Sequence, residues 1–141
     1  MLSFNKPKRE GFFVQKMKPC ILVVDDDHEI FDILTHVLEP EGFEVLWAKN
    51  GEEFLRKALL RRPRLIMLDI GLGHENGPEL YKRLLLHGLD RRIPVIFISS
   101  SIENKPQSQP ALQPGRQYAM HGKPFQFERL LTDIRLLMSA A

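Results

Sequence analysis

Four consecutive apolar residues, Leu65-Ile66-Met67-Leu68, run directly into Asp69 near the middle of the chain. Because successive side chains of a strand point to opposite faces of its sheet, an unbroken apolar run predicts a strand that is buried on both faces. Strands of this kind form parallel sheets, in which ligands bind outside the carboxyl ends of the strands. The sequence therefore predicts an α/β protein with an acidic residue at the ligand-binding edge of its sheet.

Other apolar segments also end on polar residues. The polar residues that follow these expected strands are the acidic run Asp25-Asp26-Asp27, Ser99 and Lys123. If the strands are parallel neighbours, their carboxyl ends meet at one edge of the sheet. We therefore expect carboxylates, a hydroxyl group and an ammonium group to lie together at that edge.

Strand and helix patterns alternate along most of the chain. Strands are expected at 20–24, 43–47, 65–69, 95–98 and near Met120, and helices at 27–39, 51–61, 77–87 and 126–138. The helices carry apolar residues at helical spacing, and Asp27 is expected to cap the first of them. This alternation predicts a parallel sheet that is covered by helices on both faces.

Residues 102–115 break the alternation where a fourth helix would be expected. Pro106, Pro110 and Pro114 recur at intervals of four and are followed by Gly115. A proline inside a helix costs about 3 kcal/mol, because it removes a hydrogen bond and clashes with the preceding turn. We expect a proline-rich loop in place of this helix, with a turn at 110–113.

The composition suits one soluble domain. The chain has 141 residues, of which 43% are hydrophobic, and a net charge of +2. Residues 1–18 are expected to form a basic tail, and the arginines are interpreted as solvated surface, so no direct nucleic-acid binding is expected. The single Cys20 excludes an internal disulfide. Since no apolar run could span a membrane and the first residues lack a secretory signal, we expect a cytoplasmic protein without membrane insertion.

These spacings resemble the receiver domain of two-component response regulators. The resemblance covers roughly residues 18–138 and rests on Asp25-Asp26, Asp69, Gly77, Ser99 and Lys123-Pro124-Phe125. It implies a flavodoxin-like, doubly wound sheet of five parallel strands in the order 2-1-3-4-5. It also implies a receiver domain at 19–139 and a cis peptide bond between Lys123 and Pro124.

The resemblance implies roles for the polar residues at the strand ends. Asp69 would be the phosphoacceptor, Lys123 and the Ser99 hydroxyl would contact phosphate oxygens, and the backbone N–H groups of Ile70 or Gly71 and of Ser100 would complete the phosphate site. Asp26 and Asp69 would bind Mg²⁺ directly, with the backbone carbonyl of Gly71, and Asp25 would act mainly through a water molecule. A cation is needed because phosphoryl transfer onto a carboxylate brings two anions together.

The implied function is that of a switch. Mg²⁺-dependent phosphorylation of Asp69, from a sensor histidine kinase or a phosphotransfer protein, would change binding to a downstream partner that the sequence does not identify. Only three residues follow Met138, so the chain is expected to act through a partner or to be a domain of a longer protein. It would not be an enzyme in the usual sense, although it would take part in its own phosphotransfer and autodephosphorylation.

Two alternatives remain open at this stage. The first is an interaction module that keeps the receiver fold and no longer uses phosphorylation. The second is an aspartate-based phosphatase of the haloacid dehalogenase type, which needs a second aspartate two residues after the nucleophile, where this chain has Gly71. Met120 also replaces the aromatic residue that the family usually carries, and Gly73 replaces a proline. We therefore expect signalling through a surface other than the fourth-helix face.

Overall fold

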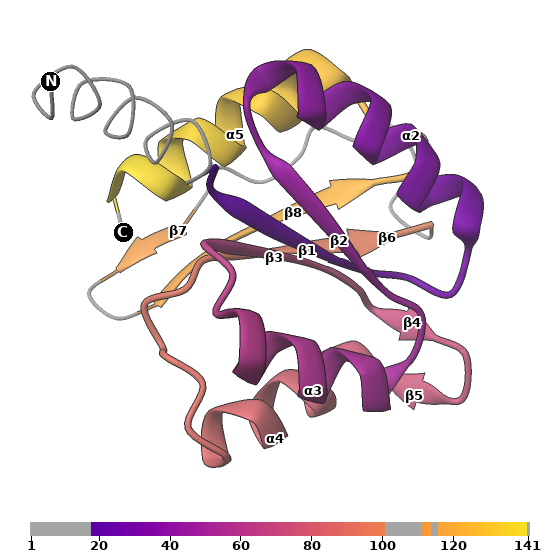
Figure 1. Ribbon diagram of the computed structural model, residues 1–141, viewed down its shortest axis with the longest axis vertical. Coiled ribbons are helices and arrows are strands. Elements are labelled where there is room, and N and C mark those ends of the chain that lie inside the picture. Colours follow the sequence, from indigo (N-terminus) through magenta and orange to yellow (C-terminus); the bar gives the residue numbers. More distant parts are fainter. Residues whose placement is uncertain (1–17, 101–110, 114–115, 141) are drawn as a thin grey trace, which may run out of the picture.

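A single mixed sheet forms the centre of the protein (Figure 1). The computed structural model describes residues 18–100, 111–113 and 116–140. The strand order is β2-β1-β3-β6-β8-β7. The parallel strands are β1 (Cys20–Val24), β2 (Glu44–Ala48), β3 (Leu65–Asp69), β6 (Val95–Ser99) and β8 (Arg116–Gly122). The doubly wound arrangement of five parallel strands that the sequence predicts is confirmed.

Four helices cover the two faces of the sheet. Figure 1 shows α2 (His28–Leu38) and α5 (Phe127–Ala140) on one face, and α3 (Gly51–Arg61) and α4 (Gly77–Leu86) on the other. Alternate residues of β1 divide between these layers: Ile21 and Val23 pack in the α2/α5 layer, and Leu22 and Val24 pack in the α3/α4 layer. The apolar runs are unbroken because each strand has a core on both sides.

Side-chain caps set the starting points of three helices. Asp27 accepts a hydrogen bond from the Glu29 N–H at 3.0 Å, which confirms its predicted role as a cap. Asn50 and Asn76 do the same at the starts of α3 and α4. Each cap satisfies a backbone donor that the helix leaves free. The caps therefore start α2, α3 and α4 within a few residues of the strand or hairpin that precedes each of them.

The segment between β6 and β8 differs in part from the sequence-based prediction. The turn expected at 110–113 is wrong for residues 111–113, because β7 (Ala111–Gln113) is a short strand that pairs antiparallel with β8. Residues 101–110 and 114–115 of the expected proline-rich loop lie outside the described residues. A strand is compatible with this sequence because the prolines flank β7 and none lies within it.

Arg62 has an unusual backbone conformation at the end of α3. Its φ of 46° and ψ of 66° place it in the left-handed region, and it is the only residue other than glycine with a positive φ in the described parts of the chain. A side chain in this region is disfavoured by about 1–2 kcal/mol, because its Cβ crowds the following carbonyl. Glycine avoids this crowding.

We predict that Arg62→Gly stabilises the protein by about 0.5–1 kcal/mol, because the relief of strain exceeds the extra chain entropy that glycine brings to the unfolded state. Chemical denaturation of the two proteins measures this change. Gly42→Ala is the matched control, since Gly42 has a φ of 94° and nothing within 4 Å of an added Cβ. It should lose stability through strain alone. A destabilised Arg62→Gly protein would contradict the prediction.

Candidate functional site

Three carboxylates meet at the carboxyl ends of β1 and β3. Val24 and Leu68 are paired neighbours in the sheet, so Asp25 and Asp69, which follow them, lie side by side. One oxygen from each of Asp25, Asp26 and Asp69 lies within 4.8 Å of the others. Asp25 is fully buried, Asp69 is 7% exposed and Asp26 is exposed. The cluster thus has a buried floor and an opening to solvent.

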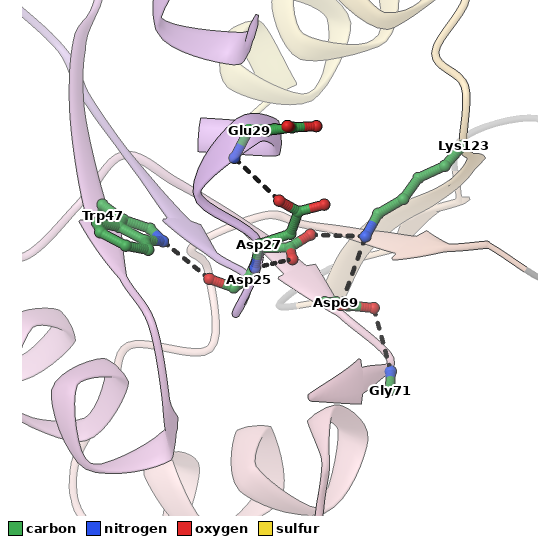
Figure 2. Close-up of polar contacts among 7 residues, drawn as sticks. All are labelled: Asp25, Asp27, Glu29, Trp47, Asp69, Gly71 and Lys123. Atoms are coloured by element: carbon green, nitrogen blue, oxygen red, sulfur yellow. Dashed lines mark hydrogen bonds and ion pairs between the residues drawn. The ribbon is translucent and has the colours of Figure 1, made fainter. Parts of the chain in front are cut away.

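Lys123 neutralises part of this negative charge. Its Nζ lies 2.8 Å from Asp25 Oδ2 and 3.5 Å from Asp69 Oδ2 (Figure 2). The lysine follows β8, two strands away from β3, and its backbone N–H donates to the Ser99 carbonyl at 3.0 Å. The Lys123–Pro124 peptide bond is cis, as the sequence predicts. The expected meeting of the Lys123 ammonium with the aspartates is therefore confirmed.

The two charged groups at the centre of the site have shifted pKa values. Burial raises the pKa of Asp69, and the nearby charge of Asp25 raises it further, against the opposing effects of Lys123 and Gly71. Burial alone would lower the pKa of Lys123, but its hydrogen bond to Asp25 and the charges of Asp25 and Asp69 raise it overall. The site therefore holds a firmly charged ammonium beside a carboxylate that is disfavoured as an anion. A bound cation would relieve this repulsion.

The loop after Asp69 contacts both its carboxylate and its backbone. The Gly71 N–H donates to Asp69 Oδ1 at 3.1 Å. The loop then forms a two-residue hairpin, β4 (Gly71–Leu72) with β5 (Glu75–Asn76), before α4 begins at Gly77. A Cβ on Gly77 would lie 2.4 Å from the Asp69 carbonyl oxygen, so only glycine allows this close approach. This close approach explains why the residue at position 77 of the sequence pattern is a glycine.

Trp47 is a contributor that the sequence analysis placed only in a strand. Its indole N–H donates to the Asp25 carbonyl at 2.8 Å (Figure 2), and its ring stacks on Phe31 at 5.5 Å. The edge of the ring also meets His28. Trp47 thereby fixes the backbone of the acidic run from the side of β2. An indole one residue before the end of an edge strand gives no signal of this role in the sequence.

Glu75 also contributes to the site, because it links the loop after Asp69 to α3. Its Oε1 accepts the Gly51 N–H at 3.0 Å, at the start of that helix. A carboxylate is favourable there, since the first N–H groups of a helix carry partial positive charge. Glu75 therefore anchors the β4–β5 hairpin from a distance in sequence that no local pattern reveals.

The remaining predicted residues surround the three carboxylates to different degrees. Ser99 ends β6 at 6% exposure, and Ser100 follows it in an exposed turn. The Ile70 N–H is already used in the sheet, where it donates to the Ile98 carbonyl at 2.9 Å. Of the two backbone donors that the sequence left open, Gly71 therefore has the one directed at Asp69, and Ile70 does not.

The donor set fits a hard divalent cation. It offers only oxygen atoms, and Mg²⁺ prefers oxygen ligands while it keeps several of its waters. Within the described residues, the three aspartates form the only group of acidic, histidine or cysteine side chains close enough to share an ion. The exposure of Asp26 leaves room for those waters. The fold and the site thus define an α/β domain whose acidic cluster, at the carboxyl ends of β1 and β3, could hold a cation.

Comparison with known proteins identifies this class more closely. Residues 21–135 match the family described as the response regulator receiver domain. The transcriptional regulatory protein YbdJ of Bacillus subtilis is 33% identical over 118 residues, which cover 84% of this chain and 50% of that protein. The phosphate regulon transcriptional regulatory protein PhoB of Rhizobium meliloti is 30% identical over 125 residues, which cover 89% of this chain and 54% of that protein.

Solved structures agree with this assignment. A CheY-like response regulator receiver domain protein from Methanospirillum hungatei superposes with a TM-score of 0.69 and 30% identity, over 86% of this chain and 94% of that chain. The protein therefore belongs to the response regulator receiver domain family, whose place is in phosphorylation-dependent two-component signalling. The chain spans about half the length of the curated relatives it matches. Among the described residues, no helix has the length and apolar character needed to cross a membrane.

The raised pKa of Asp69 makes stability depend on pH. An acid with a raised pKa holds its proton more tightly in the folded protein than in the unfolded chain, so the free energy of unfolding falls as the pH rises past the ordinary carboxyl pKa. We predict that Asp69→Asn stabilises the protein at pH 7 in the presence of a chelator, and that this gain disappears towards pH 3. Denaturation at the two pH values measures the difference.

Asp90→Asn is the control, because its effect on stability at pH 7 should have the opposite sign. Hydrogen bonds from Arg92 lower the pKa of Asp90, so its contribution to stability is present above the ordinary carboxyl pKa and is lost as the pH falls. The asparagine variant should thus lose stability at pH 7 and match the wild type near pH 3. A gain from Asp69→Asn that is equal at both pH values would refute the assignment to Asp69.

Proposed function

We propose that Asp69 is the phosphoacceptor of this receiver domain and that Mg²⁺, bound by Asp25, Asp26 and Asp69, supports the transfer. The observation that carries this proposal is the position of the Asp69 carboxylate. It lies at the carboxyl edge of the sheet, beside a lysine ammonium and two further carboxylates. An isolated acid at a strand end could serve only as a cap. Three acids that repel one another around one lysine need a ligand of positive charge to become stable together.

In this proposal, each side chain at the site has its own role in phosphoryl transfer. A carboxylate oxygen of Asp69 attacks phosphorus, and the bond from phosphorus to the donor nitrogen breaks. Lys123 would supply a positive charge for a phosphate oxygen, and the hydroxyl of Ser99, which follows the strand neighbour of Asp69 in β6, would contact another. The N–H groups of Gly71 and Ser100 complete the set of donors. Asn or Gln at position 69 would lack the nucleophilic oxygen.

The metal would supply charge neutralisation between the carboxylates and the incoming phosphoryl group. Asp26 and Asp69 are the direct ligands in this proposal, together with the carbonyl of Gly71, which accepts one hydrogen bond from the Gly73 N–H and retains a second lone pair. Both oxygens of Asp25 are already engaged, one with the Asp27 N–H at 2.9 Å and one with Lys123. This favours contact between Asp25 and the ion through a water molecule.

In this proposal, movement of Lys123 starts the switch. Its ammonium now lies closer to Asp25, at 2.8 Å, than to Asp69, at 3.5 Å. A phosphoryl group on Asp69 adds negative charge and acceptor oxygens on the side of Asp69, which draws the ammonium away from Asp25. Movement of Lys123 would be transmitted through its backbone bond to Ser99 at the end of β6. The two states would then present different surfaces to a partner.

The phosphate donor is proposed to be a sensor histidine kinase or a phosphotransfer protein, and the output is proposed to pass to a protein partner. The curated relatives are named as transcriptional regulators, and the present chain matches about half of their length. We propose that the receiver domain spans residues 19–139, which the family match at 21–135 supports. Residues 1–17 lie outside the described part of the chain.

We predict that the protein forms an acid-stable, base-labile phosphoprotein when it is incubated with Mg²⁺ and acetyl phosphate, and that Asp69→Asn does not. Intact-protein mass spectrometry measures the added phosphoryl group. Asp27→Asn is the matched control: it lies in the same acidic run, and asparagine caps a helix as well as aspartate does. It should be phosphorylated as the wild type is. Phosphorylation of Asp69→Asn, or none of the wild type, would refute the proposal and favour a module that does not use phosphate.

A further inference from the structure

A second hollow lies at the opposite end of the sheet from Asp69. It has a volume of about 620 Å³ and is bordered by the last turn of α3, the residues that lead into β3, and the connection from α4 to β6. Leu59, Leu89 and Ile93 contribute apolar walls, and Arg62, Arg64 and His87 contribute the polar ones. We call this hollow the basic-pole pocket. Arg64 directly precedes β3 and Asp69 ends it, so the pocket and the carboxylate cluster are separated by the length of that strand.

The fold brings two basic segments together around this pocket. Arg61-Arg62-Pro63-Arg64 and Arg91-Arg92 are far apart in the sequence, and a smaller adjoining hollow of about 190 Å³ is lined by both Arg64 and Arg92. The sequence analysis treated these arginines as solvated surface. Of these arginines, Arg62, Arg64 and Arg92 line the two adjoining hollows, an arrangement that exists only in the folded chain.

The arginines of this cluster differ in their partners. Arg61 is paired with Glu44, and Arg92 is paired with Asp90 at 3.0 Å. Arg62 and Arg64 are exposed, and neither has an ion-pair partner in the parts of the chain that the structure describes. The negative end of the α3 dipole favours a nearby cation, but Arg61 in the last turn of α3 already provides one, so the dipole does not require Arg62. It does not account for Arg64, which lies beyond Pro63 and outside the helix.

The backbone strain at Arg62 is a second, independent observation. This position favours glycine, yet it carries a long cationic side chain at the border of the pocket. Residues held in unfavourable backbone conformations often belong to functional sites. The guanidinium at this position is therefore a candidate for a function that outweighs the loss of stability.

We propose that the basic-pole pocket binds a nucleotide-like anion, with its phosphates on Arg62 and Arg64 and its planar body against the apolar walls. Guanidinium groups match phosphate oxygens with two parallel hydrogen bonds. The volume of the pocket falls in the range of small-molecule sites, roughly 300–1,000 Å³. Asp90 also lines the pocket, but its carboxylate is already bonded to Arg92, so Arg62 and Arg64 are the lining arginines left for the phosphates of the ligand. A concave pocket with apolar walls favours a small molecule over a polymer that binds through charge alone.

Binding of ADP to the whole chain tests this proposal, at fixed ionic strength and without divalent cations so that the carboxylate cluster does not recruit the nucleotide. Calorimetry should show ADP binding that is about tenfold or more tighter than binding of pyrophosphate, which has the phosphates without the body. Amide chemical shifts should change at Leu89 and Ile93 and stay constant at Asp69 and Gly71.

Two variants test whether ADP binds in the pocket or is only attracted to a basic surface. Arg62→Gly combined with Arg64→Ala should weaken ADP binding about tenfold or more, and the folded state should survive because glycine suits the backbone at position 62. Arg56→Ala is the matched control, since it removes an exposed charge from the same helix outside the pocket. Equal binding of ADP and pyrophosphate, equal losses in both variants, or no binding by the wild type would each overturn the proposal.

Discussion

The ion pair between Lys123 and Asp25 is the interaction on which the rest of the site depends. Asp25 is fully buried, and a buried carboxylate without a positive partner is strongly unfavourable. The lysine that balances it comes from the far side of β6, so the charge balance requires all four central strands to end at the same edge. The same ammonium lies 3.5 Å from Asp69, and it thereby links the buried Asp25 to the Asp69 carboxylate. Loss of Lys123 would leave the buried acids to repel one another.

Three local contacts hold the backbone around the acidic residues in position. Trp47 bonds to the carbonyl of Asp25, Gly71 bonds to the side chain of Asp69, and Gly77 lets α4 approach the Asp69 carbonyl. Each of these contacts holds part of the backbone around the acids, and the negative charge that the acids share favours a bound cation. Because Asp26 is exposed, a ligand can reach the cluster from solvent on the side of Asp26.

The sequence predicts most of the fold and of the site, because both depend on strand ends. An apolar run that stops at a polar residue determines the strand, its burial and the edge on which the polar group lies, as Asp25, Asp69 and Lys123 show. Trp47, Glu75 and the basic-pole pocket depend on contacts between distant segments, which no local pattern encodes. The strand β7 was missed because the prolines around it dominate the pattern, although Pro114-Gly115 between two short non-proline segments is typical of a hairpin turn.

We propose that the three aspartates, with the acceptor Asp69 among them, form one cation site. Anomalous scattering from Mn²⁺, which takes the same oxygen ligands as Mg²⁺, measures this directly in a crystal of the protein. The account predicts one strong anomalous peak within bonding distance of Asp26, Asp69 and the Gly71 carbonyl, with Asp25 linked to the ion through water. A crystal that holds Mn²⁺ elsewhere and none among the three aspartates would contradict it.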